Sequence, residues 1–117
     1  MGQLTTHVLD ISSGKPASGI LIELVKLEGK EKIKVADVKT NSDGRCGTPL
    51  IGGNDFLPGE YELAFHVGEF FERLNESRIE TQFLNIVPIR FNIVDCSDNY
   101  HVPLLISPFG YTTYRGS

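Results

Sequence analysis

Short runs in which apolar and polar residues alternate recur along almost the whole chain, and this pattern constrains the fold most. In the first run, Leu4, Thr6 and Val8 share one face of an extended chain. A period of two residues is typical of a strand that buries one face. The runs lie at residues 4–9, 20–24, 33–38, 61–67, 87–93, 102–106 and 109–114, with a shorter one at 48–51. Because turn-forming residues separate them, the sequence predicts an all-β protein, a two-sheet sandwich of about eight short strands.

The segment Glu69–Glu76 departs from this pattern. Its apolar residues Phe70, Phe71 and Leu74 have the spacing of one helix face. The sequence therefore predicts one short helix of about two turns.

Length and charge limit the domain organisation and the partners. The 117 residues suit one domain that buries its own core, so we expect a single domain over residues 1–117. The formal net charge of −4 disfavours nucleic acid as a partner, because phosphate binding needs a basic patch. The local cluster Lys30, Lys32 and Lys34 alternates with other residues and is typical of a solvated strand face. No apolar run approaches the roughly 20 residues that cross a bilayer, so we expect no membrane partner.

The two cysteines, Cys46 and Cys96, lie in different segments and form no Cys-x-x-Cys motif. This spacing supports neither a zinc site nor a disulfide framework, and the histidines show no metal-ligand spacing, so we expect no metal. Free thiols are typical of a reducing compartment. The first residues also lack the regions of a signal peptide, which favours a cytoplasmic location. A processed periplasmic form would begin in the same way.

Three histidines and two arginines are candidate functional groups. His7 lies within the first run, His66 lies on the polar face of its run, and His101 opens the run at 102–106. Each histidine taken alone is more often structural than catalytic. Arg45 directly follows a predicted turn, and Arg115 lies near the end of the chain. The sequence is compatible with two roles for each arginine, a solvent-exposed side chain or a side chain that binds an anion. The residue pattern leaves both roles open.

The chain ends on Tyr114-Arg115-Gly116-Ser117, directly after an aromatic-rich run. Most domains end in frayed, interchangeable polar residues. An arginine, a glycine, a hydroxyl and a carboxylate this close to a strand are instead expected to form part of a site.

Several short motifs follow one another in a fixed order. They are Leu4-Thr5-Thr6-His7-Val8-Leu9-Asp10, Gly14-Lys15-Pro16-Ala17, Asp43-Gly44-Arg45, His101-Val102-Pro103-Leu104-Leu105, Ser107-Pro108-Phe109-Gly110 and the final Tyr114-Arg115-Gly116-Ser117. Each motif is weak alone, but together, over the whole chain, they resemble the transthyretin-related 5-hydroxyisourate hydrolases. Transthyretins themselves are similar in strand layout, but they lack the paired histidines and this ending.

The resemblance implies a transthyretin-like sandwich with one short helix. It also implies a homotetramer whose central channel holds the sites at a subunit interface, with no metal or cofactor. The implied reaction belongs to purine catabolism. It hydrolyses the ring amide of 5-hydroxyisourate, the product of urate oxidase, to 2-oxo-4-hydroxy-4-carboxy-5-ureidoimidazoline.

Carried over position by position, the resemblance implies that His7, Arg45 and His101 are catalytic. It implies substrate contacts from Arg45, Ser117 and Tyr114. An imidazole can deprotonate the attacking water or protonate the leaving nitrogen near neutral pH, and a guanidinium stabilises the oxyanion. We assign the water-activating role to His101 and positioning or proton transfer to His7.

Asn99 departs from the family pattern, because many relatives have histidine at this position. We expect this difference to change the local pH response and to leave activity in place.

Two other functions compete with hydrolysis. A transthyretin-type carrier would bind a small aromatic ligand without turnover. A structural β-sandwich domain would have no site and would be a monomer. The paired histidines and Arg45 favour the hydrolase over both.

Overall fold

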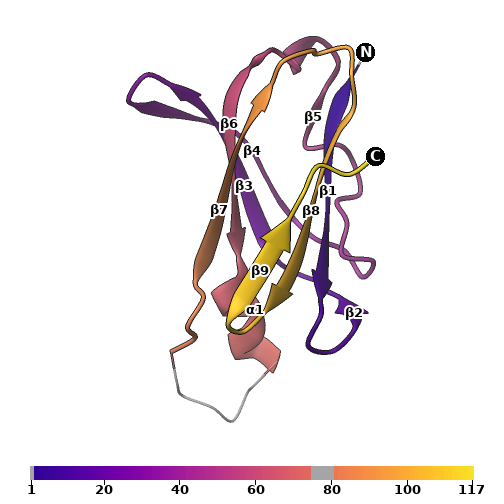
Figure 1. Ribbon diagram of the computed structural model, residues 1–117, viewed down its shortest axis with the longest axis vertical. Coiled ribbons are helices and arrows are strands. Elements are labelled where there is room, and N and C mark those ends of the chain that lie inside the picture. Colours follow the sequence, from indigo (N-terminus) through magenta and orange to yellow (C-terminus); the bar gives the residue numbers. More distant parts are fainter. Residues whose placement is uncertain (1, 75–80) are drawn as a thin grey trace.

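The computed structural model describes residues 2–74 and 81–117 and consists of two sheets packed face to face (Figure 1). The strands are β1 (Gln3–Asp10), β2 (Lys15–Pro16), β3 (Leu21–Glu28), β4 (Glu31–Lys39), β5 (Ile51–Gly52), β6 (Gly59–His66), β7 (Ile86–Ile93), β8 (Tyr100–Ser107) and β9 (Gly110–Thr113). Two short helices accompany them, the 3-10 helix η1 (Gly53–Asp55) and the α-helix α1 (Val67–Leu74). The prediction of an all-β, two-sheet sandwich with one short α-helix is confirmed.

The first sheet has the strand order β2-β1-β8-β9, with β5 paired to the start of β1, and the second has the order β4-β3-β6-β7. The pair β1–β8 is parallel, whereas the other strand pairs of the described residues are antiparallel. In the parallel register Thr5 lies opposite His101, and His7 lies opposite Pro103. Residues far apart in the sequence therefore become neighbours on one sheet face.

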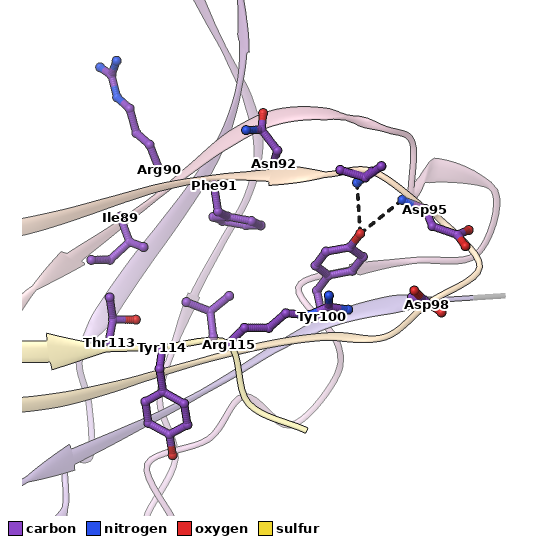
Figure 2. A pocket seen from close by; sticks show the side chains of 12 residues that line it. Ile89, Arg90, Phe91, Asn92, Asp95, Asp98, Tyr100, Thr113, Tyr114 and Arg115 are labelled. Carbon is purple, nitrogen blue, oxygen red and sulfur yellow. Dashed lines mark hydrogen bonds between the residues drawn. The ribbon is translucent and has the colours of Figure 1, made fainter.

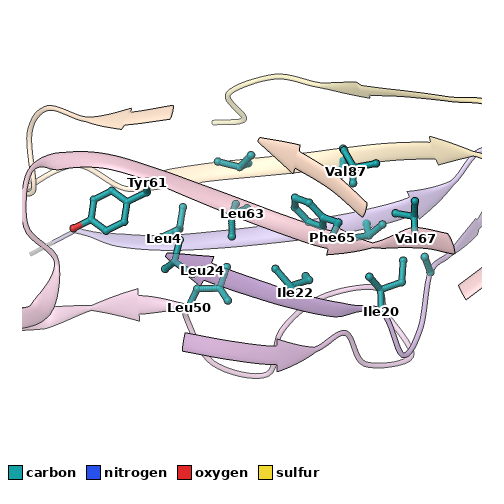
Figure 3. Packing of buried hydrophobic residues seen from close by; sticks show 14 of the residues in the cluster. Leu4, Ile20, Ile22, Leu24, Leu50, Tyr61, Leu63, Phe65, Val67 and Val87 are labelled. Carbon is teal, nitrogen blue, oxygen red and sulfur yellow. The ribbon is translucent and has the colours of Figure 1, made fainter. Parts of the chain in front are cut away.

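The core lies between the two sheets. The alternation of apolar and polar residues along the strands places apolar side chains there. In β1 the even-numbered residues are buried and the odd-numbered ones are partly or fully exposed. Figure 3 shows Leu4, Leu24 and Leu63 gathered with other apolar side chains between the sheets. Residues without any exposed surface include Leu4, Val8, Ile20, Ile22, Leu24, Leu63, Phe65, Leu104 and Ile106. This burial of apolar surface holds the sheets together.

The helix begins earlier than the sequence predicted. It starts at Val67, which the alternation had assigned to the preceding strand, and its last described residue is Leu74. Gly68 fits inside the helix because its backbone lies against Asn85, where a Cβ atom would approach to 2.9 Å. Phe70 is buried as expected. Residues 75 and 76 of the predicted helix lie outside the described residues.

Local differences appear elsewhere. The strand predicted at 48–51 is the two-residue β5, the loop predicted after it contains η1, and the two-residue β2 had no sequence signal. The lysines of β4 are exposed, as predicted. In the described part of the chain, no helix is long and apolar enough to cross a membrane.

Candidate active site

A cavity of about 450 Å³ lies on the first sheet, beside the beginnings of β1 and β8. Its lining residues are Gln3, Thr5, Thr6, Arg45, Cys46, Asn99, His101 and Ser117. The structure thus brings Arg45, His101 and Ser117 together from three distant parts of the sequence.

His101 reaches the cavity because of the alternation in β8. Its neighbours Tyr100 and Val102 are buried, so His101 lies on the opposite face and is half-buried. The parallel register places Thr5 beside it, and Thr5 Oγ1 lies 2.9 Å from Nδ1 of the imidazole. In the tautomer with its proton on Nδ1, the ring donates to this hydroxyl and leaves Nε2 unprotonated. Within residues 2–74 and 81–117, Nε2 has no hydrogen-bond partner.

The surroundings of His101 favour its neutral form. Burial lowers the pKa of the imidazole below its usual value of 6.5, and the positive charges of Arg45 and His7 lower it further. The hydrogen bond to Thr5 opposes these effects. The net lowering leaves the ring uncharged and able to accept a proton near neutral pH.

A tight turn holds Arg45 beside β1. The backbone N–H of Arg45 donates to Asn41 Oδ1 at 3.2 Å, and its carbonyl accepts from the Asn41 N–H at 2.8 Å. Gly44 adopts a φ of +73°, and a Cβ atom there would lie 2.3 Å from the carbonyl oxygen of Val8. Glycine therefore allows the turn to dock on β1, where the Gly44 carbonyl accepts from the Val8 N–H at 2.8 Å.

This docking makes His7 and Arg45 neighbours in an isolated antiparallel bridge. His7 lies on the same face of β1 as Thr5, two residues away, and is half-buried. It does not line the cavity, but it is close enough for its charge to lower the pKa of His101. His7 thus lies near the cavity but is not one of its lining residues.

The last residues of the chain approach His101 directly. The Gly116 N–H donates to the His101 carbonyl at 2.7 Å, and the two residues form a second isolated bridge. Ser117 then extends into the wall of the cavity. The C-terminal residues thus lie beside His101 and its cavity, and their contribution to a site stays a prediction.

Tyr114 lies elsewhere. It lines a second cavity, of about 480 Å³, between β7 and the residues around β9, and its side chain is 57% exposed. Figure 2 shows this side chain pointing away from the other labelled residues of that cavity. Within this chain Tyr114 does not join the cavity of His101, and its contact with substrate stays a prediction.

The remaining candidates have structural surroundings. His66 Nε2 lies 2.6 Å from Glu23 Oε1, and both residues belong to the second sheet, away from the cavity. Both cysteines are free thiols, and burial raises the pKa of Cys46, which keeps that thiol protonated. Within the described residues, no group of three His, Cys, Asp or Glu side chains could hold a metal ion.

Sequence reasoning missed two contributors to the site, Thr5 and Gly116. Alternation placed Thr5 on the face of His7, but no sequence signal revealed that β1 pairs with β8. Gly116 was part of a noted motif, yet its contact with the imidazole depends on tertiary structure alone.

Known proteins resemble this chain over its full length. A family model described as the HIUase/Transthyretin family matches residues 4–116. The 5-hydroxyisourate hydrolase 2 of Rhizobium meliloti is 51% identical, over 99% of this chain and 97% of its own length. The solved 5-hydroxyisourate hydrolase of Klebsiella pneumoniae is 35% identical over the full length of both chains, with a TM-score of 0.83.

Two further structures share the fold. A solved (S)-allantoin synthase is 43% identical over 99% of this chain, with a TM-score of 0.90. This chain spans only 44% of that longer protein. Sea bream transthyretin, solved in complex with thyroxine, is 23% identical over 97% of this chain and 94% of its own, with a TM-score of 0.87, and supports the fold alone.

The fold and the site together define a transthyretin-like sandwich whose first sheet carries a cavity with an imidazole, a guanidinium and a hydroxyl. Transthyretins and hydrolases both use this architecture. The chain belongs to the HIUase/Transthyretin family.

Proposed function

We propose that this protein hydrolyses the ring amide of 5-hydroxyisourate to 2-oxo-4-hydroxy-4-carboxy-5-ureidoimidazoline. One observation carries the proposal: a neutral imidazole, His101, shares a cavity with the cation Arg45. The full-length similarity to proteins named 5-hydroxyisourate hydrolase supports this choice of substrate. Ring opening by water needs a base and a group that stabilises negative charge, and the cavity offers both.

His101 acts as the general base in this proposal. Its Nδ1 is engaged by Thr5, so the attacking water gives its proton to Nε2. Because the pKa of His101 is lowered, the ring is unprotonated at neutral pH and its Nε2 lone pair is available to the water. The water then attacks the ring carbonyl carbon as hydroxide.

Arg45 stabilises the oxyanion that forms on the attacked carbonyl, because its planar donors match developing negative charge. His7, next to Arg45, transfers a proton to the leaving nitrogen, so that the carbon–nitrogen bond breaks to an amine rather than an anion. Ser117 hydrogen-bonds the substrate from the cavity wall. In the assembled protein, a homotetramer, this open cavity is completed at a subunit interface.

The decay of freshly generated 5-hydroxyisourate tests the activity. The intermediate is produced with urate oxidase, and its ultraviolet absorbance is followed with and without the protein. Micromolar protein is expected to accelerate the decay. An unchanged decay rate, together with measurable binding of a small aromatic ligand, would instead identify a carrier of the transthyretin type.

Substitution of His101 tests the mechanism. His101→Asn removes the base and is expected to lower kcat by about 10²–10⁴-fold, the usual contribution of general acid–base catalysis. His7→Asn and Arg45→Gln are expected to lose activity while keeping the circular dichroism spectrum of the parent. His66→Asn is the matched control, because His66 pairs with Glu23 outside the cavity. Full activity of the His101 variant would contradict the assignment.

A further inference from the structure

Arg115 lines the cavity of about 480 Å³, and its contacts lead towards His101. Its guanidinium carbon lies 4.2 Å from the centre of the Tyr100 ring, and its Nη2 donates to the Asn99 carbonyl at 3.2 Å. Figure 2 shows the Arg115 side chain reaching across to that ring. A cation over an aromatic face is attracted by the negative potential of the ring. Both partners of Arg115, Asn99 and Tyr100, directly precede His101.

The Tyr100 ring, over which the Arg115 guanidinium lies, is held in place by its own contacts. The side chain is buried, and its hydroxyl accepts the backbone N–H groups of Val94 and Asp95 at 2.9 and 3.1 Å. Phe56 packs edge-on against the ring, with the centroids 5.9 Å apart. The ring therefore has little freedom to move, and a guanidinium stacked on it is held in place.

The next residue, Gly116, touches the imidazole of His101. A Cβ atom at Gly116 would lie 2.6 Å from Cδ2 of that ring, roughly 0.8 Å closer than ordinary contact begins. Cδ2 is bonded to Nε2, the nitrogen that serves as base in the proposed reaction. The ring is thus hydrogen-bonded at Nδ1 to Thr5, and the Gly116 backbone lies close to its Cδ2–Cγ edge.

We propose that Arg115 is a positioning residue: stacked on Tyr100, it holds the C-terminal segment against His101 and so fixes the orientation of the imidazole. The kinetic effect of this role rests on the proposed hydrolase function, whereas its effect on the orientation of the imidazole does not. Arg115 touches neither His101 nor the cavity that His101 lines and acts through Gly116.

Arg115→Gln tests this role through kinetics. An orientation error of about 1 Å typically costs about 100-fold in rate. We expect kcat to fall by about that factor, with a much smaller change in KM, because the imidazole acts in the transition state. The matched control is Arg73→Gln, which also removes an exposed guanidinium that donates to a backbone carbonyl, that of Gly19. The control is expected to keep the parent kcat, and both variants the parent Tm to within a few degrees.

The imidazole itself provides a readout that needs no substrate. In the parent protein, the Nδ1 and Nε2 resonances of His101 in NMR spectra are expected to show a single tautomer. In Arg115→Gln they should move towards the averaged values of a mobile imidazole, whereas Arg73→Gln should leave them in place. If the parent protein fails to hydrolyse 5-hydroxyisourate but these resonances still move, the hydrolase function is overturned and the positioning role stands.

Tyr100→Phe separates positioning from stability. It keeps the ring under Arg115 but removes the hydroxyl that accepts two backbone N–H groups. We expect a lower Tm and, because the ring under Arg115 is kept, a much smaller loss of kcat and a smaller movement of the His101 resonances than in Arg115→Gln.

Gly116→Ala tests the approach of the C-terminal segment to the His101 imidazole by changing the glycine instead of the arginine. The added methyl group must displace the imidazole, so we expect a similar loss of kcat and a similar movement of the resonances. Gly110→Ala is the control, because a Cβ atom there meets only Ser107 Oγ at 3.9 Å. The proposal is overturned if Arg115→Gln and Gly116→Ala both match their controls in kcat and in the His101 resonances.

Discussion

At the scale of single residues, the charge state of His101 decides what the cavity can do. Partial burial, and then the electrostatic effects of Arg45 and His7, disfavour a protonated imidazole and lower its pKa. A protonated ring has no lone pair for the water proton, so kcat/KM is expected to fall as the pH drops through the pKa of His101. This acid limb should lie below pH 6.5, since the pKa is lowered from that value. A pH profile of kcat/KM with its acid limb above pH 6.5 would contradict this account.

The origin of the lowered pKa can be tested by removing the guanidinium beside the imidazole. Arg45→Gln takes away a positive charge, which favours the protonated ring, so the pKa of His101 is expected to rise towards 6.5. NMR titration of the histidine resonances measures it without activity. Arg73→Gln, which removes the same charge from helix α1, is the control and should leave the titration of His101 unchanged.

Thr5 is a second residue with an expected kinetic effect. Thr5→Val keeps the shape of the side chain and removes the oxygen that faces Nδ1. A hydrogen bond of about 1 kcal/mol corresponds to a roughly fivefold change, so we expect kcat to fall by about that factor or more. Thr112→Val, on an exposed position of β9, is the control. Equal kcat for both variants would show that the hydroxyl does not orient the ring.

At the scale of elements, alternation predicted the strands and helical spacing predicted the helix. Neither pattern predicted which strands pair with each other. The runs at 4–9 and 102–106 were visible as strands, since each carries its own period of two. Their parallel pairing was not, because contacts between residues 96 positions apart leave no mark on local sequence. The sequence therefore supplied the candidates Arg45 and His101, and only the register of β1 and β8 brought Thr5 into the site. The turn at Asp43-Gly44 was predictable, whereas its docking on Val8 was not.

The docked turn can be tested through its glycine. Gly44→Ala places a Cβ atom against the Val8 carbonyl at a positive φ. We expect a loss of about 1–3 kcal/mol in the free energy of unfolding, measured by urea denaturation. Gly47→Ala is the control, since no atom lies within 4 Å of its Cβ position, and its effect should stay within about 0.5 kcal/mol. Equal stability of the two variants would argue against a tightly docked turn.

At the scale of the whole molecule, the two sheets end on β7 and β9, which flank the larger cavity. Strand edges without partners can pair with another chain. Nearby, Phe83 and Phe109 stack with centroids 6.0 Å apart although they are 72% and 78% exposed. Exposed aromatic surface of this kind marks contact sites between proteins. These features support the proposed homotetramer.

Light scattering coupled to size exclusion is expected to give four times the chain mass of 13.0 kDa. Phe109→Glu should shift the protein to smaller species with an unchanged circular dichroism spectrum, because a carboxylate cannot be buried at an apolar contact without cost. Ile33→Glu, on the exposed β4, is the matched control and should leave the mass unchanged. A single species of the chain mass at micromolar concentration would contradict the assembly.

The parallel pairing of β1 with β8 also determines when the site can form. Thr5 and His101 are separated by 96 positions, and closing so long a loop is entropically costly and slow. The β3–β4 hairpin of the second sheet joins strands close in sequence and can assemble without either residue. We therefore expect a refolding chain to regain the β3–β4 hairpin before its base meets the threonine hydroxyl. On the ribosome, β1 can pair with β8 only after β8 has been synthesised, so the site forms late in the folding of this sandwich.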